Sequence, residues 1–464
     1  MIALTLADVA SLCGGTLSPE ADPATRITGA AVADSRRVTP GGLFVAVVGV
    51  HVDGHDFAAR AVAGGAVAVL ASRRVGVPAV LVDDTVLALG RLAHGYLDRL
   101  DATVVGVTGS SGKTSTKDML AQVLAEIGPT VAPEGSFNTE VGVPLTVLRA
   151  DPTTRFLVLE MSARGVGHID YLCQIAPPKI GAVLNVGTAH LGEFGSREIV
   201  ARAKGELVEA LPADGVAVLN ADDPLVSAMR GRTQARVVTF GASADADVRA
   251  SDIVLDPLAR PRFHLHTRDA EVEVALQVHG AHQVSNSLAV AAIALELGLP
   301  LDAIGEALGN ARPASRWRME VTERADGVTI VNDAYNANPE SVRAALAALA
   351  AMGQGRRTWA VLGEMAELGE EAHDAHAGVG AAAAQAGIDR LVVVGTAAAG
   401  IAEGAAAIGF SSSALHCVDD VDKAAQLLEA ELQGGDVVLV KASRAADLQR
   451  VAERLLAAEA RARA

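Results

Sequence analysis

Short, almost uninterrupted runs of valine, leucine and isoleucine recur along the chain, and each ends in a turn of glycine or polar residues. In the middle of the chain these runs are TVVGV (103–107), RFLVLEM (155–161), IGAVLNV (180–186) and GVAVLN (215–220). They show no alternation of apolar and polar positions, which is typical of strands buried on both faces of a parallel sheet. Helical patterns separate them, so the pattern predicts an α/β fold with a mainly parallel sheet.

The same order of buried strand, polar turn and helix continues on both sides of this region. A polar connection at 96–103 and the pair Arg312–Pro313 mark the two boundaries. The 464 residues fit about three domains at roughly 150 residues each. We therefore predict three α/β domains, a first (1–100), a central (101–312) and a third, doubly wound and Rossmann-like (313–464). The flanking apolar runs are 43–50, 66–71 and 78–84 before the central region and 328–336, 358–365, 390–397 and 436–444 after it.

The first central run leads into TGSSGKT (Thr108–Thr114) and then into a helical pattern. Backbone N–H groups at the N-terminus of such a helix face an anion, and Gly109 and Gly112 can adopt conformations closed to other residues. Lys113 offers a charge for the β- and γ-phosphates, and Thr114 a hydroxyl ligand for Mg²⁺. Val107 stands where the usual phosphate loop has its first glycine. The sequence favours a nucleotide site over an ordinary strand-to-helix turn, and spacing alone does not distinguish ATP from GTP.

Two further candidates follow neighbouring runs. Glu160 closes the run 155–161, and His190 lies just beyond the run 180–186. Each alone has a plain structural reading, as a residue turning to solvent or a surface histidine. Because ligands bind at the carboxyl ends of parallel strands, we expect both near Thr114, where hard oxygen ligands and a single histidine suit Mg²⁺.

Lys204 lies in a predicted helix that Ser196 is placed to cap. Val200, Lys204 and Val208 are four residues apart and share one ridge of that helix. A lysine on an apolar ridge points toward protein, so it needs a partner or a modification, whereas the plain reading is a solvated lysine.

Polar residues also gather in VNDAYNANPES (331–341). Asn338 and Pro339 fit an N-cap and the first position of a helix. That structural reading leaves Asp333, Tyr335 and Asn336 unexplained at the carboxyl end of a predicted strand.

Composition narrows the classes of partner. The formal charge is −16 and no block of lysine and arginine appears, which argues against a nucleic-acid or anionic membrane surface. Three separated cysteines (Cys13, Cys173 and Cys417) fit neither a disulfide framework nor a zinc site and suit the cytoplasm. We expect no signal peptide, since no basic region precedes the first apolar residues. We also expect no membrane span, because no charge-free apolar stretch reaches about 18 residues.

Together these motifs resemble the Mur ligase family, the ATP-dependent amide ligases of peptidoglycan precursor synthesis, over nearly the whole chain. The family's short T-G-x-x-G-K-T loop matches Thr108–Thr114, its N-x-x-x-A-H-L matches Asn185–Leu191, and its A-K-x-x-L matches Ala203–Leu207. In many members that lysine is carbamylated and helps to hold a second Mg²⁺. The resemblance implies two Mg²⁺ ions on Thr114, Glu160, His190 and carbamylated Lys204, with Lys113, Glu160, His190 and Lys204 as the catalytic set. It implies ATP contacts by Thr108, Gly109, Ser110, Ser111, Gly112, Lys113, Thr114, Ser115, Asn286, Arg316 and Asp333.

The longer motifs are similar to those of family members that add D-Ala-D-Ala. They are Asp333–Ser341, Leu362–Gly369 and Lys441–Arg444, beside segments similar to the part that holds the UDP-sugar, Asp34–Arg36, Pro40–Ala46, Asp53–Phe57 and Gly135–Leu145. The implied substrate contacts are Ser35, Arg36, Asn138, Thr139, Asn336, Lys441, Ser443 and Arg444. Gln283 replaces an asparagine expected near adenine, and Ser162 and Ser315 replace glycines. Neither serine removes a charged group, so we expect activity to survive.

The resemblance implies an ATP-dependent ligase that joins D-Ala-D-Ala to UDP-N-acetylmuramoyl-tripeptide through an acyl phosphate, as a cytoplasmic monomer. Two alternatives stay open: a sister ligase that adds another amino acid, and a nucleotide-binding regulatory protein without ligase chemistry. Dependence of phosphate release on D-Ala-D-Ala, compared with single amino acids, separates the three.

Overall fold

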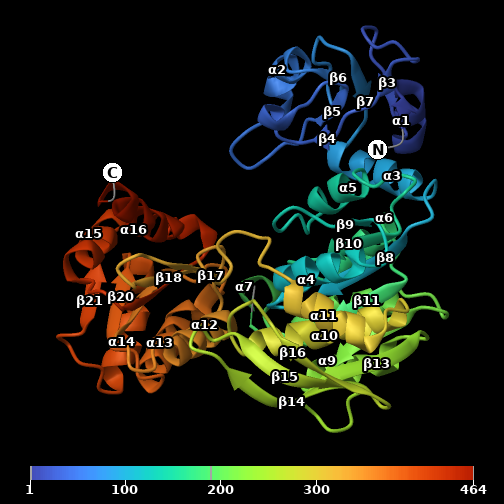
Figure 1. Ribbon diagram of the computed structural model, residues 1–464. Coiled ribbons are helices and arrows are strands. Elements are labelled where there is room, and N and C mark those ends of the chain that lie inside the picture. The colour runs from blue at the N-terminus through green and yellow to red at the C-terminus, as the bar shows by residue number, and fades with distance from the viewer. Residues whose placement is uncertain (1–2, 189–190, 463–464) are drawn as a thin grey trace.

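The computed structural model describes residues 3–188 and 191–462, and Figure 1 shows three α/β parts in chain order. His190 lies outside the described residues. The predicted boundaries fall between α3 (Thr85–Leu97) and β8 (Thr103–Thr108), and between α11 (Leu301–Asn310) and β17 (Glu320–Glu323). Within the described ranges, no helix is both long enough and apolar enough to cross a membrane.

The first part is built on a five-stranded sheet in the order β2-β7-β6-β5-β4, in which only the β2–β7 pair is antiparallel. A two-stranded pair, β1–β3, lies beside it. The runs predicted at 66–71 and 78–84 are strands β6 and β7. The elements are β1 (Leu4–Thr5), α1 (Leu6–Cys13), β2 (Thr16–Leu17), β3 (Arg26–Ile27), β4 (Ala31–Val32), η1 (Ser35–Arg37), β5 (Gly42–Val45), η2 (Gly54–Phe57), α2 (Ala58–Ala63), β6 (Ala66–Ala71), β7 (Ala79–Leu81) and α3.

The central part is built on a nine-stranded sheet in the order β16-β15-β14-β13-β12-β11-β8-β10-β9. All pairs from β14 to β9 are parallel, which confirms the mainly parallel sheet. Its strands are β8, β9 (Thr130–Val131), β10 (Phe156–Glu160), β11 (Ile180–Val183), β12 (Val216–Asn220), β13 (Arg236–Gly241), β14 (Val248–Leu255), β15 (Pro261–His266) and β16 (Glu271–Ala275). Its helices are α4 (Lys113–Ala125), α5 (Gly142–Val147), α6 (His168–Ile175), α7 (Leu191–Phe194), α8 (Arg197–Glu209), α9 (Pro224–Ser227), η3 (Ala228–Arg232), α10 (His282–Glu296) and α11.

The two faces of the central sheet are covered by different helices, as continuous apolar strands require. Val105 and Val107 pack with Leu120 of α4 and Ile293 of α10, whereas Leu157 and Leu207 belong to the core on the opposite face. Strands β14 to β16 form an antiparallel extension that the sequence pattern did not predict. One face of such an extension stays in solvent, so its strands lack the continuous apolar run.

The third part has a six-stranded sheet in the order β17-β18-β22-β19-β20-β21, parallel except for β17. Helices cover both of its faces, with Leu362 and Trp359 of the same strand in separate cores, which agrees with the doubly wound prediction. The elements are β17, β18 (Thr329–Asn332), α12 (Pro339–Met352), β19 (Thr358–Leu362), η4 (Gly369–Glu371), α13 (Ala372–Gln385), β20 (Arg390–Val394), η5 (Thr396–Ala398), α14 (Ala399–Ala407), β21 (Leu415–Val418), α15 (Val421–Glu431), β22 (Val437–Lys441), η6 (Arg444–Ala446) and α16 (Gln449–Ala462).

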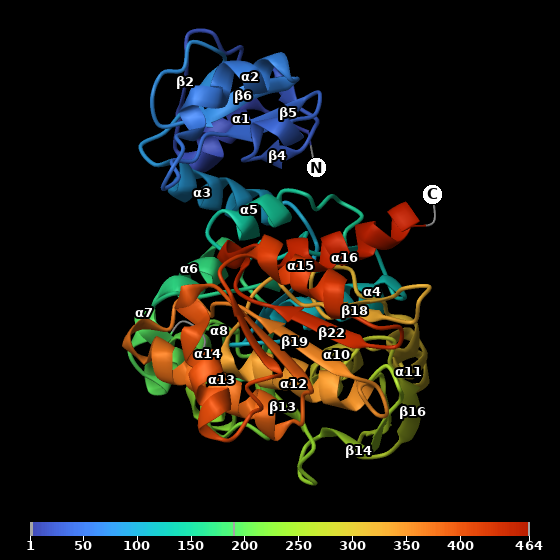
Figure 2. The ribbon, with the colours of Figure 1, turned by 90° about the vertical axis from the view of Figure 1, so that its left-hand side faces the viewer.

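The three parts are joined in two different ways. Figure 1 shows the first part standing on the central part through α3, which lies against α5 and α6, and one continuous apolar core crosses this junction. Tyr96 of α3 is fully buried there and donates a hydrogen bond to the carbonyl of Ala150 (2.6 Å). Figure 2 shows the third part in front of the central part. Between the central and third parts there are hydrogen bonds, such as that of Thr188 to Glu340, and apolar contacts of Ala259 with the core of the third part. Residues of both parts line a cavity.

Candidate functional site

A cavity of about 630 Å³ lies between the central and third parts. The loop after β8 and the N-terminus of α4 form one wall, and segments 333–341 and 441–444 form the facing wall. Most of the predicted site residues line it, namely Ser110, Ser111, Gly112, Lys113, Thr114, Ser115, Asn138, Thr139, Glu160, Asn286, Asp333, Asn336, Lys441, Ser443 and Arg444. Residues far apart in sequence therefore meet at one site.

The loop after β8 has the geometry of an anion cradle. Gly112 adopts a left-handed conformation (φ 79°) directly before α4 and has no side-chain cap. A Cβ atom at Gly112 would collide with Oδ1 of Asn286, so the position needs glycine for both reasons. The N–H groups of Ser110 and Ser111 donate to Oδ1 of Asn185 (3.0 Å each). Asn185 thus fixes the loop from the end of the neighbouring strand, β11.

Glu160 lies at the end of β10 beside this loop, and its side chain is buried. The hydroxyl of Thr114 donates to one carboxylate oxygen (2.9 Å), and Nδ2 of Asn138 donates to the other (2.7 Å). Ser136 Oγ lies 3.3 Å from the Thr114 hydroxyl. Two hard oxygen ligands, one at the start of α4 and one at the end of β10, therefore converge, and oxygen ligands of this kind suit Mg²⁺. Among the described residues there is no cluster of three His, Cys, Asp or Glu side chains that could hold a metal.

Two lysines approach this site from different elements. Lys113 donates to the carbonyl of Gly109 (2.7 Å), and burial lowers its pKa although the charge of Glu160 opposes the change. Lys204 lies in α8, which Ser196 caps as predicted, and is 4% exposed. Burial, and then the charge of Lys113, hold the pKa of Lys204 well below its usual value. Among the described residues, no hydrogen bond or ion pair joins the Lys204 amino group to another side chain or carbonyl.

The facing wall carries a buried ion pair at the end of β18. Nζ of Lys441 lies 2.7 Å from Oδ2 of Asp333 and also donates to the carbonyl of Asn336 (2.9 Å). Asp333 Oδ1 accepts the N–H of Met319 (3.0 Å). Ser443 is buried and its hydroxyl accepts the N–H of Ala366 (2.9 Å). Asn338 caps α12 as the sequence predicted, with a capping box that includes Ser341.

Two arginines of the linker between the central and third parts lie in different environments. The side chain of Arg316, the predicted phosphate contact, is 70% exposed and pairs with Glu453 (3.5 Å). Arg318 instead lines the cavity and donates to Ser136 Oγ (2.8 Å), and its guanidinium lies over the ring of Tyr335 (4.2 Å). Arg318 is therefore among the residues that line the cavity and Arg316 is not, and the ATP contact predicted for Arg316 stays a prediction. Both arginines stand in the same RWRME stretch, and the sequence holds no signal that separates them.

The third part also holds the segment that follows β11. Glu340, at the start of α12, accepts hydrogen bonds from the N–H (3.0 Å) and the hydroxyl (2.8 Å) of Thr188. The N–H of Gly192 donates to the carbonyl of Glu367 (3.2 Å). These contacts lie on both sides of residue 190. Nothing in the sequence pattern pointed to Glu340.

The remaining predicted residues lie around the cavity or outside it. The Nδ2 group of Asn286 donates to Oε1 of Gln283 (2.9 Å), so the residue that replaces the expected asparagine is part of the same buried pair. Thr108 is buried beneath the loop. Ser35 and Arg36 lie in η1 of the first part and do not line the cavity, and Arg36 forms an exposed ion pair with Asp34 (2.7 Å).

Three protein-family models match most of the chain: "Mur ligase family, catalytic domain" over 31–96, "Mur ligase middle domain" over 107–294 and "Mur ligase, glutamate ligase domain" over 317–444. The chain belongs to the Mur ligase family. Its curated relatives include the UDP-N-acetylmuramoyl-tripeptide--D-alanyl-D-alanine ligase of Mycobacterium tuberculosis, 50% identical over 502 aligned residues that cover 98% of each chain. The protein of that name from Escherichia coli is 39% identical and covers 85% of this chain and 86% of its own.

Solved structures of Mur ligases agree with this arrangement. MurF from Acinetobacter baumannii superposes with a TM-score of 0.87 at 31% identity, covering 98% of both chains. MurF ligase from Thermotoga maritima, solved in complex with ADP, gives a TM-score of 0.81 at 34% identity over 94% of this chain and 99% of its own. The predicted three-domain α/β Mur ligase fold is thus confirmed.

Proposed function

We propose that this protein is an ATP-dependent ligase that joins D-alanyl-D-alanine to UDP-N-acetylmuramoyl-tripeptide, in cytoplasmic peptidoglycan precursor synthesis. The observation that carries the proposal is one cavity in which the phosphate loop (108–114) faces the Asp333–Ser341 and Lys441–Arg444 segments. The curated relatives that match 98% of the chain carry the name of this activity. We assign 1–100 to UDP-sugar binding, 101–312 to ATP and 313–464 to D-Ala-D-Ala.

A carboxylate is a poor electrophile, because direct attack by an amine would have to expel oxide. In the proposed first step, a tripeptide carboxylate oxygen attacks the γ-phosphorus of ATP, the bond to ADP breaks, and an acyl phosphate forms. The D-Ala-D-Ala amine then attacks the acyl carbon, loses a proton, and expels inorganic phosphate. Both reactants of the first step are anionic, so neutralising charge is the main catalytic task.

The residues of the loop are suited to that task. The free N–H groups at the start of α4 and the amino group of Lys113 would bind the β- and γ-phosphates. We assign to Arg318 the phosphate contact that the sequence suggested for Arg316, because its guanidinium lies 2.8 Å from Ser136 at the cavity wall. Asp333 would contact the ribose, and the buried pair of Asn286 and Gln283 would contact the base.

The residues also fit Mg²⁺. When bound, the ion neutralises phosphate charge. Thr114 and Glu160 would hold one ion through the hydroxyl and carboxylate that lie 2.9 Å apart. His190 and Lys204, the latter as a carbamate, would hold a second. A carbamate supplies two oxygen ligands, whereas the unmodified ammonium group could supply none. It would also give the Lys204 side chain, which has no partner among the described residues, a bound ion as its partner.

The proposal is tested by the amino-acid dependence of phosphate release. The purified protein is given ATP, Mg²⁺ and UDP-N-acetylmuramoyl-tripeptide, and then D-Ala-D-Ala, D-Ala or the amino acids used by sister ligases. We expect release with D-Ala-D-Ala and formation of the pentapeptide product by mass spectrometry. Release with a single amino acid instead would identify a sister ligase, and nucleotide binding without turnover would favour a regulatory protein.

A further inference from the structure

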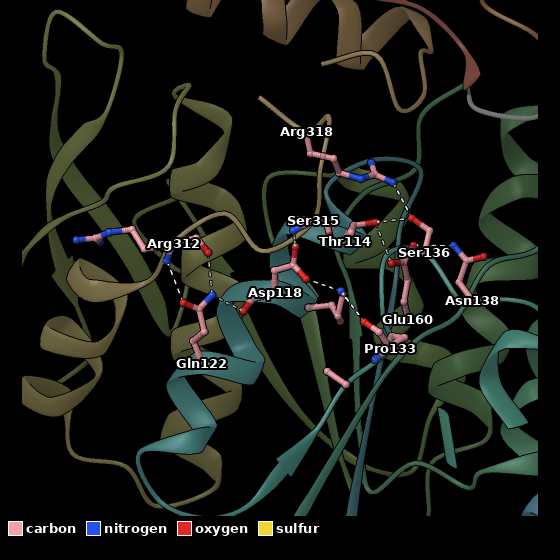
Figure 3. Close-up of polar contacts among 12 residues, drawn as sticks. Thr114, Asp118, Gln122, Pro133, Ser136, Asn138, Glu160, Arg312, Ser315 and Arg318 are labelled. Atoms are coloured by element: carbon pink, nitrogen blue, oxygen red, sulfur yellow. Dashed lines mark hydrogen bonds and ion pairs between the residues drawn. The ribbon is translucent and has the colours of Figure 1, made fainter. Parts of the chain in front are cut away.

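The linker that joins the central and third domains, 311–319, is attached at several points to the helix that begins at the phosphate loop. Thr114, Asp118 and Gln122 are four residues apart on α4 and therefore share one ridge of that helix. Thr114 faces the predicted metal site, and the next two residues of the ridge hold the linker. Figure 3 shows Gln122 pointing toward Arg312 and Asp118 pointing toward Ser315.

Gln122 holds the start of the linker with both atoms of its amide. Its Oε1 accepts the N–H of Arg312 (3.0 Å), and its Nε2 donates to the carbonyl of Arg312 (2.9 Å). The same Nε2 donates to the carbonyl of Asp118 in its own helix (2.9 Å). The Arg312 N–H can donate only to the amide oxygen, and the two carbonyls can accept only from the amide nitrogen. These three contacts therefore determine the orientation of the Gln122 amide.

Asp118 holds the linker three residues further on. Its Oδ2 accepts the N–H of Ser315 (3.0 Å), although the carboxylate is almost completely buried. Lys117 pairs with Asp118 and donates to the carbonyl of Pro133 (2.9 Å), so the buried charge is balanced. A buried carboxylate with a paired cation and a backbone donor forms a rigid anchor.

Beyond these anchors the linker adopts an unusual backbone that presents Arg318. Trp317 (φ 58°) and Met319 (φ 48°) both adopt left-handed conformations, which are uncommon for residues other than glycine. Their N–H groups donate to carboxylates, that of Trp317 to Glu320 and that of Met319 to Asp333 (3.0 Å each). Strained residues of this kind persist only where their surroundings hold them, and they gather at functional sites.

We infer that Gln122 and Asp118 are positioning residues: they fix the linker on the phosphate-loop helix so that Arg318 reaches the site of phosphoryl transfer. The inference rests on the proposed function. The contacts run in one continuous path from Gln122 and Asp118 through the linker to Arg318, then to Ser136 and Thr114.

The test uses Gln122→Ala, because removing Asp118 would leave Lys117 buried without its partner and could unfold the protein. We expect kcat to fall about tenfold or more, because a misplacement of 1 Å lowers the rate by roughly 10²-fold and the linker keeps its other anchor. The dissociation constant for ATP should rise by a smaller factor than kcat falls, since the phosphate loop is intact and only the Arg318 contact is displaced. Gln174→Ala is the matched control, because the Gln174 amide donates to Asp170 of its own helix (2.8 Å) and has no hydrogen bond to a described linker residue. Gln122→Glu keeps the acceptor for the Arg312 N–H and loses the donor, so its kcat should lie between those of the wild type and Gln122→Ala.

A double-mutant cycle separates positioning from a general structural effect. If Gln122 acts through Arg318, Gln122→Ala should cost kcat less than about twofold in an Arg318→Lys background. Equal losses in both backgrounds, or a wild-type kcat for Gln122→Ala, would overturn the inference.

A fluorescence measurement tests the linker without reference to activity. The chain has two tryptophans, of which Trp359 is fully buried, so iodide quenching reports on Trp317 in the linker. Quenching should increase in Gln122→Ala and stay unchanged in Gln174→Ala; unchanged quenching in both would contradict the inference. If the wild-type protein does not release phosphate in response to D-Ala-D-Ala, the proposed function is refuted. The quenching comparison would still test whether Gln122 holds the linker.

Discussion

The contact between Gly192 and Gly369 offers a direct test of whether this arrangement of the central and third domains is the productive one. A Cβ atom added at Gly192 would lie 2.5 Å from the backbone N of Gly369 and 2.8 Å from its Cα. Carbon contacts are normally about 3.5–4.0 Å. The atoms on the other side belong to the backbone, so no side chain can rotate away. Gly192→Ala therefore requires the two domains to separate locally by about 1 Å.

Displacement on this scale is enough to impair the reaction. Groups of the third domain, including Arg318 and the Asp333–Lys441 pair, would shift relative to the phosphate loop. A misplacement of about 1 Å is expected to lower kcat by roughly 10²-fold. Binding of ATP should be affected less, since Lys113 and the loop belong to the central domain.

The assay compares kcat from phosphate release, the dissociation constant for ATP and the melting temperature of Gly192→Ala with those of the wild type. Gly231→Ala is the matched control, because a Cβ atom there has no neighbour within 4 Å, and we expect it to behave as wild type. A wild-type kcat for Gly192→Ala would refute the reasoning, since the contact would then play no part in turnover. A large fall in melting temperature would instead show that the substitution disturbs the central domain.

Three further predictions concern single residues. Lys113→Ala should lower kcat by at least roughly 10²-fold, the scale for losing one transition-state donor, and near-normal turnover would exclude its phosphate role. Lys204→Ala should be nearly inactive and regain activity with added short carboxylic acids, and full activity without them would exclude the carbamate. Burial lowers the pKa of His282 to about 4 from its usual 6.5. Between these values the unfolded chain binds a proton that the folded chain does not, so stability falls as pH falls from 6.5 to 4, by at most about 1.4 kcal/mol per pH unit. Urea unfolding at pH 7 and 5 should show a smaller loss in His282→Asn than in the wild type, and equal losses would contradict this.

Much of the fold followed from local pattern. The run at 66–71 is strand β6, and Ser196 and Asn338 cap the helices they were predicted to cap. Such features depend on neighbours in the sequence, so periodicity and capping chemistry reveal them. Strands β14 to β16 were missed, because a sheet with one face in solvent has no continuous apolar run to detect.

The site was predictable where motifs fall at strand ends. Thr114 lies at the start of α4, just after β8, and Glu160 ends the adjacent strand β10; their side chains lie 2.9 Å apart as the parallel topology led us to expect. Arg316 and Arg318 could not be separated, because the left-handed residues on either side of Arg318 follow from contacts with Glu320 and Asp333, not from local preference.

The sequence by itself thus determined the three α/β domains, the turn that leads from β8 into α4 and the place of Glu160 at the end of β10, since each rests on interactions between near neighbours in the chain. Only the tertiary structure decided how the third domain meets the loop. Arg318, Glu340 and Gln122 owe their places to partners 182, 152 and 190 residues away in sequence. No local pattern encodes such pairs, because the positions of both partners are set by how whole domains pack.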